Sequence, residues 1–177
     1  MLITEAIRLQ IPITRICRQY FLFGIGAEGV HFDYSLTKNT SVIAAKMVRN
    51  KIISDAMLDI AAIPKPLTAQ VFNKKDCLNF SQKNGFPVVI KPADLDTGRG
   101  VYSNISCEKQ LSDGFDYAAS FSKNILIQNQ ISGKEYRLFV LNGELVWCFE
   151  RLYPSVIGDG QSSIRQLIEK ENRRSLR

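Results

Sequence analysis

Apolar residues recur at helical spacing in the first half of the chain. From Lys46 to Ala62 they fall every three or four positions, and Pro64 and Pro66 follow. This spacing predicts one helix with a buried face that ends before the prolines. A second helix is predicted between Asn73, a favourable N-cap residue, and Gly85, which suits the end of a helix.

Two later helices have their own start signals. Ser106 is placed to cap a helix that runs to about Ser122, although Gly114 inside it costs about 1 kcal/mol relative to alanine. Ser163 and Gln166 form a capping box that opens a helix continuing to the end of the sequence.

Short apolar runs predict strands between these helices, at Phe86–Pro92, Val101–Ile105 and Asn124–Gln128. Two further runs, Tyr136–Leu141 and Glu144–Phe149, flank Asn142-Gly143, which is the strongest hairpin signal in the sequence. The apolar face of this hairpin should contain Leu138, Val140, Val146 and Cys148. Two strands and one helix rarely cover such a face, so we expect an unpaired edge and an exposed apolar patch.

A glycine-rich segment, Gly24–Gly29, matches the pattern GxGxxG. A dinucleotide site of this kind needs a helix immediately after the glycines and an acid about 20 residues further on. His31 to Ser35 show no helical pattern, and Ala44 to Arg49 contain no acid. The segment therefore predicts a tight glycine turn and not a dinucleotide site.

A second glycine-rich loop, Asp94–Gly100, directly follows a predicted buried strand that carries Lys91. A lysine fixed at a strand end supplies positive charge, and Gly98 and Gly100 let backbone N–H groups approach phosphate oxygens closely. An exposed lysine before an ordinary hairpin loop is the alternative reading. The loop buries little, so we expect it to be mobile without a ligand.

Composition places the chain among globular proteins. Its 177 residues, 45% of them hydrophobic, suffice for one domain or two small lobes. The longest apolar runs are far shorter than the roughly 20 residues of a membrane helix, and Glu5 and Arg8 interrupt the N-terminal apolar pattern. We therefore expect a cytoplasmic protein with no membrane segment and no secretory signal.

The cysteines and the net charge exclude few kinds of binding site or partner. Cys17, Cys77, Cys107 and Cys148 are dispersed, and only His31 could join them, so we expect reduced, buried thiols and no zinc site. The net charge of +6 suits anionic partners, either nucleic acid or nucleotide phosphates. The basic residues are dispersed without a recognition helix, which disfavours nucleic acid.

The order of these features resembles the ATP-grasp superfamily: Lys51 at the opening of the first long helix, Lys91 on the buried strand, the glycine loop, and Ile125–Glu135. The chain looks most like the ATP-grasp module of cyanophycin synthetases and bifunctional glutathione synthetases. Three stretches carry that similarity, namely Gly24–Ala27 through Thr40-Ser41, Gly98–Val101, and Glu135–Val140 through Arg151–Pro154 and Val156–Gly160.

The resemblance implies an α+β (α/β) ATP-grasp fold of mostly antiparallel sheets with helices. Residues 1–45 would form an N-terminal strap, residues 46–130 the central lobe, and residues 131–177 the start of an incomplete C-terminal lobe. The nucleotide would lie between the two lobes. Lys51 and Lys91 would hold its phosphates, and Gly98, Arg99 and Gly100 would belong to the lid over them.

The resemblance also implies contacts to the rest of ATP. The Asn129 carbonyl and the Ile131 amide would face the adenine edge, and Gln128, where many relatives have glutamate, keeps a carbonyl acceptor for the adenine amine. Glu135 would bind the ribose hydroxyls. Arg137 would stabilise the transferring phosphoryl group, with a cross-strand charge on the hairpin as its structural alternative.

The implied activity is that of an ATP-dependent carboxylate–amine ligase, which joins a small amino acid or peptide through an acyl phosphate. The magnesium ligands of the superfamily, an acid and a Glu-x-Asn pair, do not occur after Asn142, so Mg²⁺ is expected only in the complete domain. A nucleotide-binding module without catalysis is the alternative. We expect this chain alone to have no ligase activity and to form dimers or aggregates through the hairpin.

Overall fold

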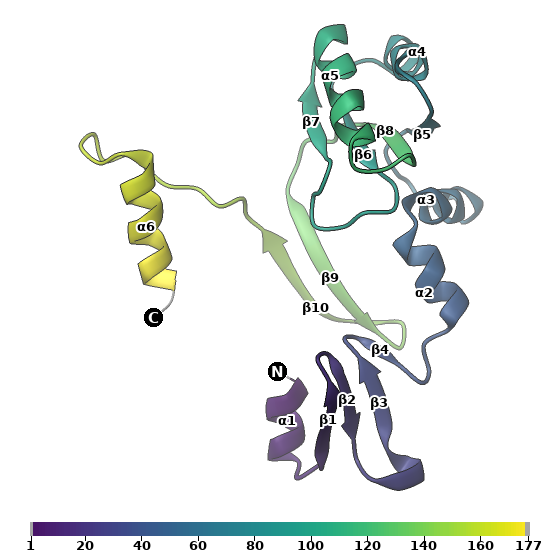
Figure 1. The fold of residues 1–177 in the computed structure, drawn as a ribbon, viewed down its shortest axis with the longest axis vertical. Helices are drawn as coiled ribbons and strands as arrows, with labels where there is room; N and C mark the ends of the chain where they lie inside the picture. The colour runs from purple at the N-terminus through teal and green to yellow at the C-terminus, as the bar shows by residue number, and fades with distance from the viewer. Residues whose placement is uncertain (1, 176–177) are drawn as a thin grey trace. The chain divides into compact units, whose positions relative to one another are not determined.

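The computed structural model describes residues 2–175 and divides into two compact units, Met1–Gln130 and Ile131–Arg177 (Figure 1). Every strand pair in it is antiparallel, and helices accompany the sheets. The predicted mixture of helices and antiparallel sheets is therefore confirmed.

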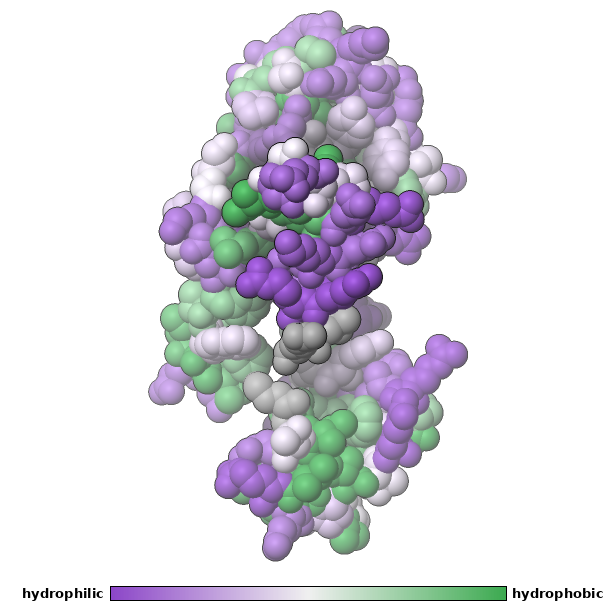
Figure 2. Space-filling model, turned by 90° about the vertical axis from the view of Figure 1, so that its left-hand side faces the viewer, coloured by the Kyte–Doolittle hydropathy of each residue, from purple (hydrophilic) through white to green (hydrophobic). Residues whose placement is uncertain are grey.

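The first unit begins with a helix and a small sheet that the sequence analysis did not predict. Helix α1 (Leu2–Arg8) precedes four strands in the order β1 (Ile13–Cys17), β2 (Tyr20–Phe23), β3 (Val30–Asp33) and β4 (Leu36–Thr37). Between β2 and β3 the glycine-rich segment makes a short 3-10 turn, η1 (Gly26–Glu28), with no helix after it, so the predicted tight turn is confirmed. Figure 2 shows hydrophobic surface gathered at the bottom of the view, over this part of the unit.

Two helices, α2 (Val42–Arg49) and α3 (Lys51–Ile60), replace the single helix predicted from Lys46 to Ala62. Asn50 between them is extended, and its side chain accepts hydrogen bonds from the N–H groups of Ile52 and Ile53 at 3.0 and 3.4 Å. Asparagine interrupts a periodic apolar pattern here because it caps a new helix. The predicted buried face was also wrong: neither helix has a buried residue, since the two pack chiefly against each other.

The hydrophobic core of the first unit belongs to a four-stranded sheet. Its strand order is β5 (Thr68–Val71), β8 (Ile125–Asn129), β6 (Val88–Pro92) and β7 (Tyr102–Ile105), with helices α4 (Lys74–Asn84) and α5 (Glu108–Ala119) packed on it. Alternate side chains of the strands meet the two helices and form one cluster of Val71, Cys77, Phe80, Val88, Ile90, Ile105, Leu111, Ala118, Ile125 and Ile127. The helices and the strands β6, β7 and β8 agree with those predicted, whereas β5 was not predicted.

The ends of α4 and α5 test the capping predictions. Asn73 caps α4 by accepting from Asp76 N at 2.9 Å, and Gly85 ends that helix at φ +79°, as predicted. The N-cap of α5 is Cys107 and not Ser106, and the Gln110 side chain accepts from Ser106 N at 2.8 Å.

Gly114 inside α5 has a packing reason. A Cβ at this position would lie 3.0 Å from Ile105 Cδ1 and 3.2 Å from the Tyr102 ring. Glycine therefore lets α5 approach β7 closely, which offsets its poor helix propensity.

The second unit consists of strands β9 (Glu135–Leu141) and β10 (Glu144–Arg151) and helix α6 (Ile164–Ser175). The hairpin prediction is confirmed, since Asn142 and Gly143 have φ values of +51° and +85° at the turn. The capping box is confirmed too: Ser163 N donates to Gln166 Oε1 at 2.8 Å and Gln166 N donates to Ser163 Oγ at 3.4 Å.

The hairpin departs from the predicted apolar face in one position. The register shifts between Leu145 and Trp147, so Leu145 pairs with Val140 and Val146 lies in the irregularity. The opposite face is also apolar, with Phe139, Leu141, Trp147 and Phe149. Every residue of both strands is exposed, and the described residues place no third strand beside them, which agrees with the expected unpaired edges and apolar patch.

The cysteines correct another expectation. Only Cys77 is buried, and burial raises the pKa of its thiol to about 12. Cys17, Cys107 and Cys148 are exposed because they lie on an edge strand, a helix cap and the uncovered hairpin. Over residues 2–175 no helix has the length and apolar character needed to cross a membrane.

Candidate functional site

Lys91 projects from the sheet face opposite the core. Val88 and Ile90 on the same strand are buried against the helices, so the intervening odd positions point the other way. The partly buried Lys91 Nζ donates to Gln128 Oε1 at 2.6 Å, and Gln128 Nε2 donates to Thr68 Oγ1 at 2.9 Å. This chain of hydrogen bonds crosses β6, β8 and β5 and fixes the position of the lysine amine.

The amine of Lys91 lacks a neutralising partner. Its pKa is lowered from the ordinary value of 10.5, first because burial removes water from the ammonium group and then because Lys51 repels it, while Asp55 opposes the change. Within residues 2–175 no carboxylate lies close enough to Lys91 for an ion pair. An anion bound here would be attracted to the Lys91 ammonium group and would stabilise its charged form.

Lys51 is tied to the segment that follows β6. As the first residue of α3 it donates from its backbone N–H to the Ala93 carbonyl at 3.0 Å, and its Nζ donates to the Leu95 carbonyl. The Asp96 carboxylate lies 3.9 Å from the same Nζ. The cap at Asn50 thus positions Lys51 at the start of the glycine loop. There Lys51 is near enough to Lys91 to lower the pKa of its amine.

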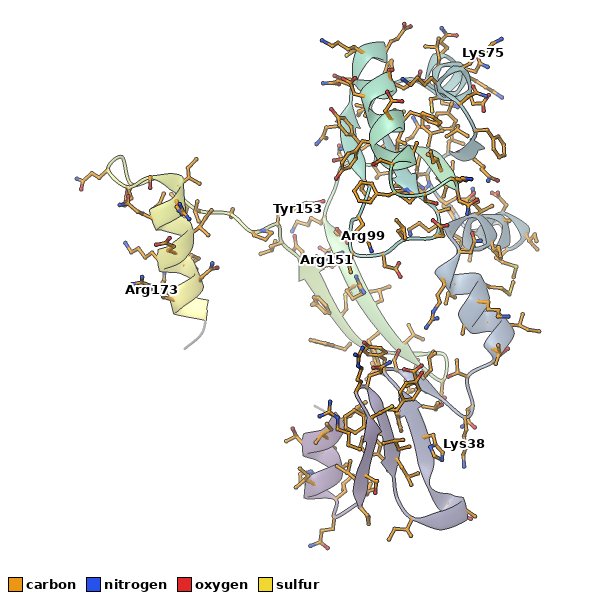
Figure 3. The ribbon with its side chains drawn as sticks, in the orientation of Figure 1. Lys38, Lys75, Arg99, Arg151, Tyr153 and Arg173 are labelled. Atoms are coloured by element: carbon orange, nitrogen blue, oxygen red, sulfur yellow. The ribbon has the colours of Figure 1, made fainter. Side chains whose placement is uncertain are left out.

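The loop between β6 and β7 is shaped by residues in the left-handed region. Thr97, Gly98 and Gly100 have φ values of +60°, +76° and +70°. A Cβ on Gly100 would lie 2.7 Å from the Pro92 ring, so only glycine fits there, whereas Gly98 has open space around it. Arg99 is exposed on this loop (Figure 3).

The anchor of the loop is Asp94. Its carboxylate accepts from Asn124 Nδ2 at 2.9 Å, and hydrogen bonds from Asn124 and then Ser122 lower the pKa of Asp94. The loop therefore has one fixed end beside the lysines, a buried glycine at the other end, and an open tip between them.

The end of β8 is fixed on both sides. Asn129 N donates to the Leu67 carbonyl at 3.0 Å, and its side-chain amide donates to the Asn84 carbonyl at 3.2 Å. The side-chain oxygen of Gln128, expected to face the adenine amine, accepts from Lys91 instead. Ile131, the expected adenine contact of the next unit, is exposed.

Glu135 and Arg137 lie on the same face of β9 in the second unit. Glu135 forms an ion pair with Arg151, the residue opposite it on β10. Arg137 lies opposite Phe149 and makes no ion pair with any residue that the structure describes. Arg137 is thus a cation available to an anion, whereas the charge of Glu135 is already balanced.

The sequence missed two parts of this arrangement. Thr68, which orients Gln128, lies on β5, where the sequence analysis predicted no strand. Asn50 had a recognisable capping side chain, but the periodic apolar residues around it favoured a continuous helix. The described residues also contain no cluster of three His, Cys, Asp or Glu side chains that could hold a metal ion, so they do not fit a magnesium site.

The chain is similar to several known proteins. Residues 54–155 match the family model described as the D-ala D-ala ligase C-terminus. Cyanophycin synthetase of Synechocystis sp. is 32% identical over 177 residues, which is 97% of this chain and 20% of the relative. The glutathione biosynthesis bifunctional protein of Streptococcus agalactiae is 30% identical over 154 residues, covering 83% of this chain and 20% of that protein.

Solved structures show the same fold. The bifunctional glutathione synthetase of Pasteurella multocida superposes with a TM-score of 0.56 at 21% identity, over 97% of this chain and 24% of that one. The D-alanine–D-alanine ligase of Helicobacter pylori gives 0.50 at 19% identity, over 76% of this chain and 46% of that one. The chain spans about a fifth of the length of the relatives named above. Because the family model covers more than half of it, the chain belongs to the D-Ala–D-Ala ligase C-terminal family of ATP-grasp proteins.

Proposed function

We propose that this chain is the ATP-binding part of an ATP-dependent carboxylate–amine ligase, which forms an amide or peptide bond through an acyl phosphate. The observation that carries the proposal is the partly buried Lys91, which lies beside Lys51 and a glycine loop and has no neutralising carboxylate among the described residues. Family membership supports it, since the relatives named above are a cyanophycin synthetase and a glutathione biosynthesis protein.

In the proposed complex Lys51 and Lys91 hold the ATP phosphates, and Gly98 and Gly100 let the loop approach them. The hydrogen bonds that link Lys91 to Gln128 and Gln128 to Thr68 hold the amine in place before the nucleotide arrives. Binding therefore costs little conformational entropy of the Lys91 side chain. Arg99 on the loop adds positive charge at its exposed tip.

The end of β8 and the second unit contribute the remaining proposed contacts. Arg137 stabilises the charge that develops on the phosphoryl group, because it has no competing ion pair among the described residues. The Asn129 carbonyl and the Ile131 amide bind the adenine edge. Glu135 binds the ribose after exchanging its contact with Arg151. ATP supplies the phosphoryl group that activates the substrate carboxylate, and that substrate is a small amino acid or peptide.

Calorimetric titration of the chain with ATP tests the phosphate site. We expect weak binding to the parent chain and a loss of about tenfold or more in Lys91→Ala and Lys91→Gln, because a charge-assisted hydrogen bond contributes about 1.5–3 kcal/mol. Lys75→Ala is the matched control, since Lys75 is an exposed lysine of α4 (Figure 3). Equal affinity in the Lys91 variants and the parent would show that Lys91 does not bind phosphate.

Ligation is tested separately from nucleotide binding. ADP release is measured with candidate amino acids, using the full reading frame that encodes the chain. Release that depends on both the amino acid and Mg²⁺ supports a ligase. Binding of ATP without such release supports a nucleotide-binding module that does not catalyse ligation.

A further inference from the structure

The connection between α3 and β5 carries a lysine that is held by two carboxylates of α3. Lys65 Nζ donates to Asp55 Oδ2 at 2.7 Å and lies 3.2 Å from Asp59 Oδ2. The side chains of Lys65 and Asp55 are 12% and 21% exposed, whereas that of Asp59 is 66% exposed. The hydrogen bond to Asp55 is the first cause of the raised pKa of Lys65. The contact of Lys65 with Asp55 is therefore the closer and better shielded of the two.

Prolines restrict the backbone around Lys65. Pro64 and Pro66 flank it, each with a fixed φ, and a residue that precedes proline favours an extended backbone. The connection therefore cannot continue α3. Asp55 and Asp59 lie one turn apart on that helix, so they form a fixed pair of acceptors for the Lys65 amine.

Asp55 also acts on Lys91 of the proposed phosphate site. It follows Lys51 by one turn of α3, and its negative charge raises the pKa of Lys91, against the effects of burial and of Lys51. Within residues 2–175, however, the Lys91 amine forms no ion pair and donates to the neutral side chain of Gln128. The carboxylate that influences Lys91 is thus paired with Lys65 instead.

The same connection determines which neutral oxygen faces Lys91. Thr68 Oγ1 donates to the Pro66 carbonyl at 3.0 Å and accepts from Gln128 Nε2 at 2.9 Å. Because the hydroxyl proton is used, the Thr68 oxygen binds the N–H side of the Gln128 amide, and Gln128 Oε1 is left to accept from Lys91. Lys91 is therefore held by an acceptor that does not cancel its charge.

We propose that Lys65 is a positioning residue of the nucleotide site, which keeps the Asp55 carboxylate from pairing with Lys91 and so leaves the Lys91 ammonium group available to a phosphate. Without Lys65, a partly buried carboxylate and a partly buried ammonium group would each lack a partner. Pairing the two would then be favourable, because an uncompensated charge away from water is costly. That pair would compete with the ATP phosphates, so this inference rests on the function proposed above.

Calorimetric titration with ATP compares the parent with Lys65→Met, Asp55→Asn and the double variant. We expect Lys65→Met to bind ATP about tenfold more weakly, because Asp55 then competes for Lys91. Asp55→Asn should bind at least as tightly as the parent, and the double variant should recover the affinity lost in Lys65→Met. If the ion pair only fastened the connection to α3, either single change would break it and both would weaken binding. Weaker binding in Asp55→Asn, or no recovery in the double variant, would overturn the proposal.

The pKa of Lys91 gives a second measurement that needs no nucleotide. It is followed by carbon-13 NMR of lysine-labelled chain, and the signal missing in Lys91→Gln identifies the residue. The pKa of Lys91 should rise in Lys65→Met, where Asp55 moves to it, and fall in Asp55→Asn, where that charge is gone. An unchanged pKa of Lys91 in Lys65→Met would overturn the inference even if ATP binds. The expected changes in a chain that does not bind ATP would instead reject the proposed function and retain the charge arrangement.

Two further variants serve as controls. Lys74→Met removes a matched lysine–aspartate pair, because Lys74 Nζ lies 2.6 Å from Asp116 Oδ2 between α4 and α5. It should change neither the ATP affinity nor the pKa of Lys91. Lys65→Arg keeps the positive charge and should bind ATP as the parent does. If circular dichroism shows that Lys65→Met does not fold, Lys65→Arg and Asp55→Asn decide the matter, since weaker ATP binding in either would contradict the proposal.

Discussion

The sheet of β5, β8, β6 and β7 in the first unit and the hairpin of the second unit are built from similar apolar strands but differ in how deeply their side chains are buried. Val88, Ile90 and Ile127 have 0% exposure, whereas Leu138 and Trp147 are 57% and 56% exposed. The sheet of β5, β8, β6 and β7 has α4 and α5 packed on it, and both hairpin faces are exposed in the described residues. An alternating apolar pattern thus specifies a strand, but only a covering element turns it into a core.

The same difference separates the proposed binding groups. Lys91 and Gln128 stand on a sheet with a packed core, and hydrogen bonds across three strands fix their side chains. Arg137 stands on a hairpin whose residues are all exposed. We therefore expect the lysines proposed to bind phosphate to be ordered before ATP arrives, and Arg137 to be the more mobile group.

Alanine substitutions in the two regions should give the largest contrast. Ile127→Ala should lower the free energy of unfolding by about 2–5 kcal/mol because it leaves a cavity in the core. Leu138→Ala should change it by less than about 0.5 kcal/mol, since its side chain is exposed. Urea unfolding followed by far-UV circular dichroism measures both values, and equal losses would show that the hairpin is buried in solution.

Self-association should depend on the hairpin. Its apolar faces should drive dimers or aggregates as concentration rises, and Trp147→Lys should shift that equilibrium toward monomer. Phe72→Lys is the control, because Phe72 is a 71% exposed aromatic residue of the first unit. Light scattering checks the mass, and fluorescence of the single tryptophan should shift to shorter wavelength on association. A parent chain that stays monomeric at all concentrations would show that the hairpin does not drive self-association.

Removing the helix cap between α2 and α3 should lower stability by an intermediate amount. Asn50→Ala removes the acceptor for two backbone N–H groups and should cost about 1 kcal/mol of stability. It should also weaken ATP binding, because Lys51 follows directly. Asn39→Ala, whose side chain makes no hydrogen bond in the described residues, should change stability by less than about 0.5 kcal/mol. Similar losses in both variants would reject the cap as the cause.

The smallest effect concerns pH. The pKa of Lys91 is lowered in the folded chain and returns to its ordinary value of 10.5 on unfolding. Between these two values the unfolded chain binds more protons, so Lys91 makes stability rise with pH there and contributes no slope at lower pH. The stability of the parent minus that of Lys91→Met should therefore rise with pH in that window, by at most about 1.4 kcal/mol per pH unit. A difference that falls as the pH rises would show that the pKa of Lys91 is raised in the folded chain and not lowered.

Local signals in the sequence predicted much of this fold. Asn73 and Gly85 bound a helix, and Asn142-Gly143 makes the hairpin turn, because each acts on its own neighbours in the chain. The predictions failed at two helix starts: Asn50 caps a new helix, and the α5 cap is Cys107, one residue after Ser106.

The candidate site was predictable as a set of residue types and not as a set of contacts. Lys91 and its glycine loop were recognisable from the sequence, but its partner Gln128 lies 37 positions away and is fixed by strand pairing. The buried carboxylate oxygen of Asp33, which has no hydrogen-bond partner among the described residues, likewise depends on the packing around β3, which periodicity cannot show.

Hydrogen exchange of the chain with and without ATP tests the central claim most directly. We predict that ATP slows exchange in residues 94–100 and at the start of α3, because the loop closes on phosphates held by Lys51 and Lys91, and that this protection is lost in Lys91→Ala. The core strand β6 and helix α5 should exchange slowly in both states, which provides an internal reference. Unchanged exchange in residues 94–100 at saturating ATP, or protection that persists in Lys91→Ala, would contradict nucleotide binding at this site.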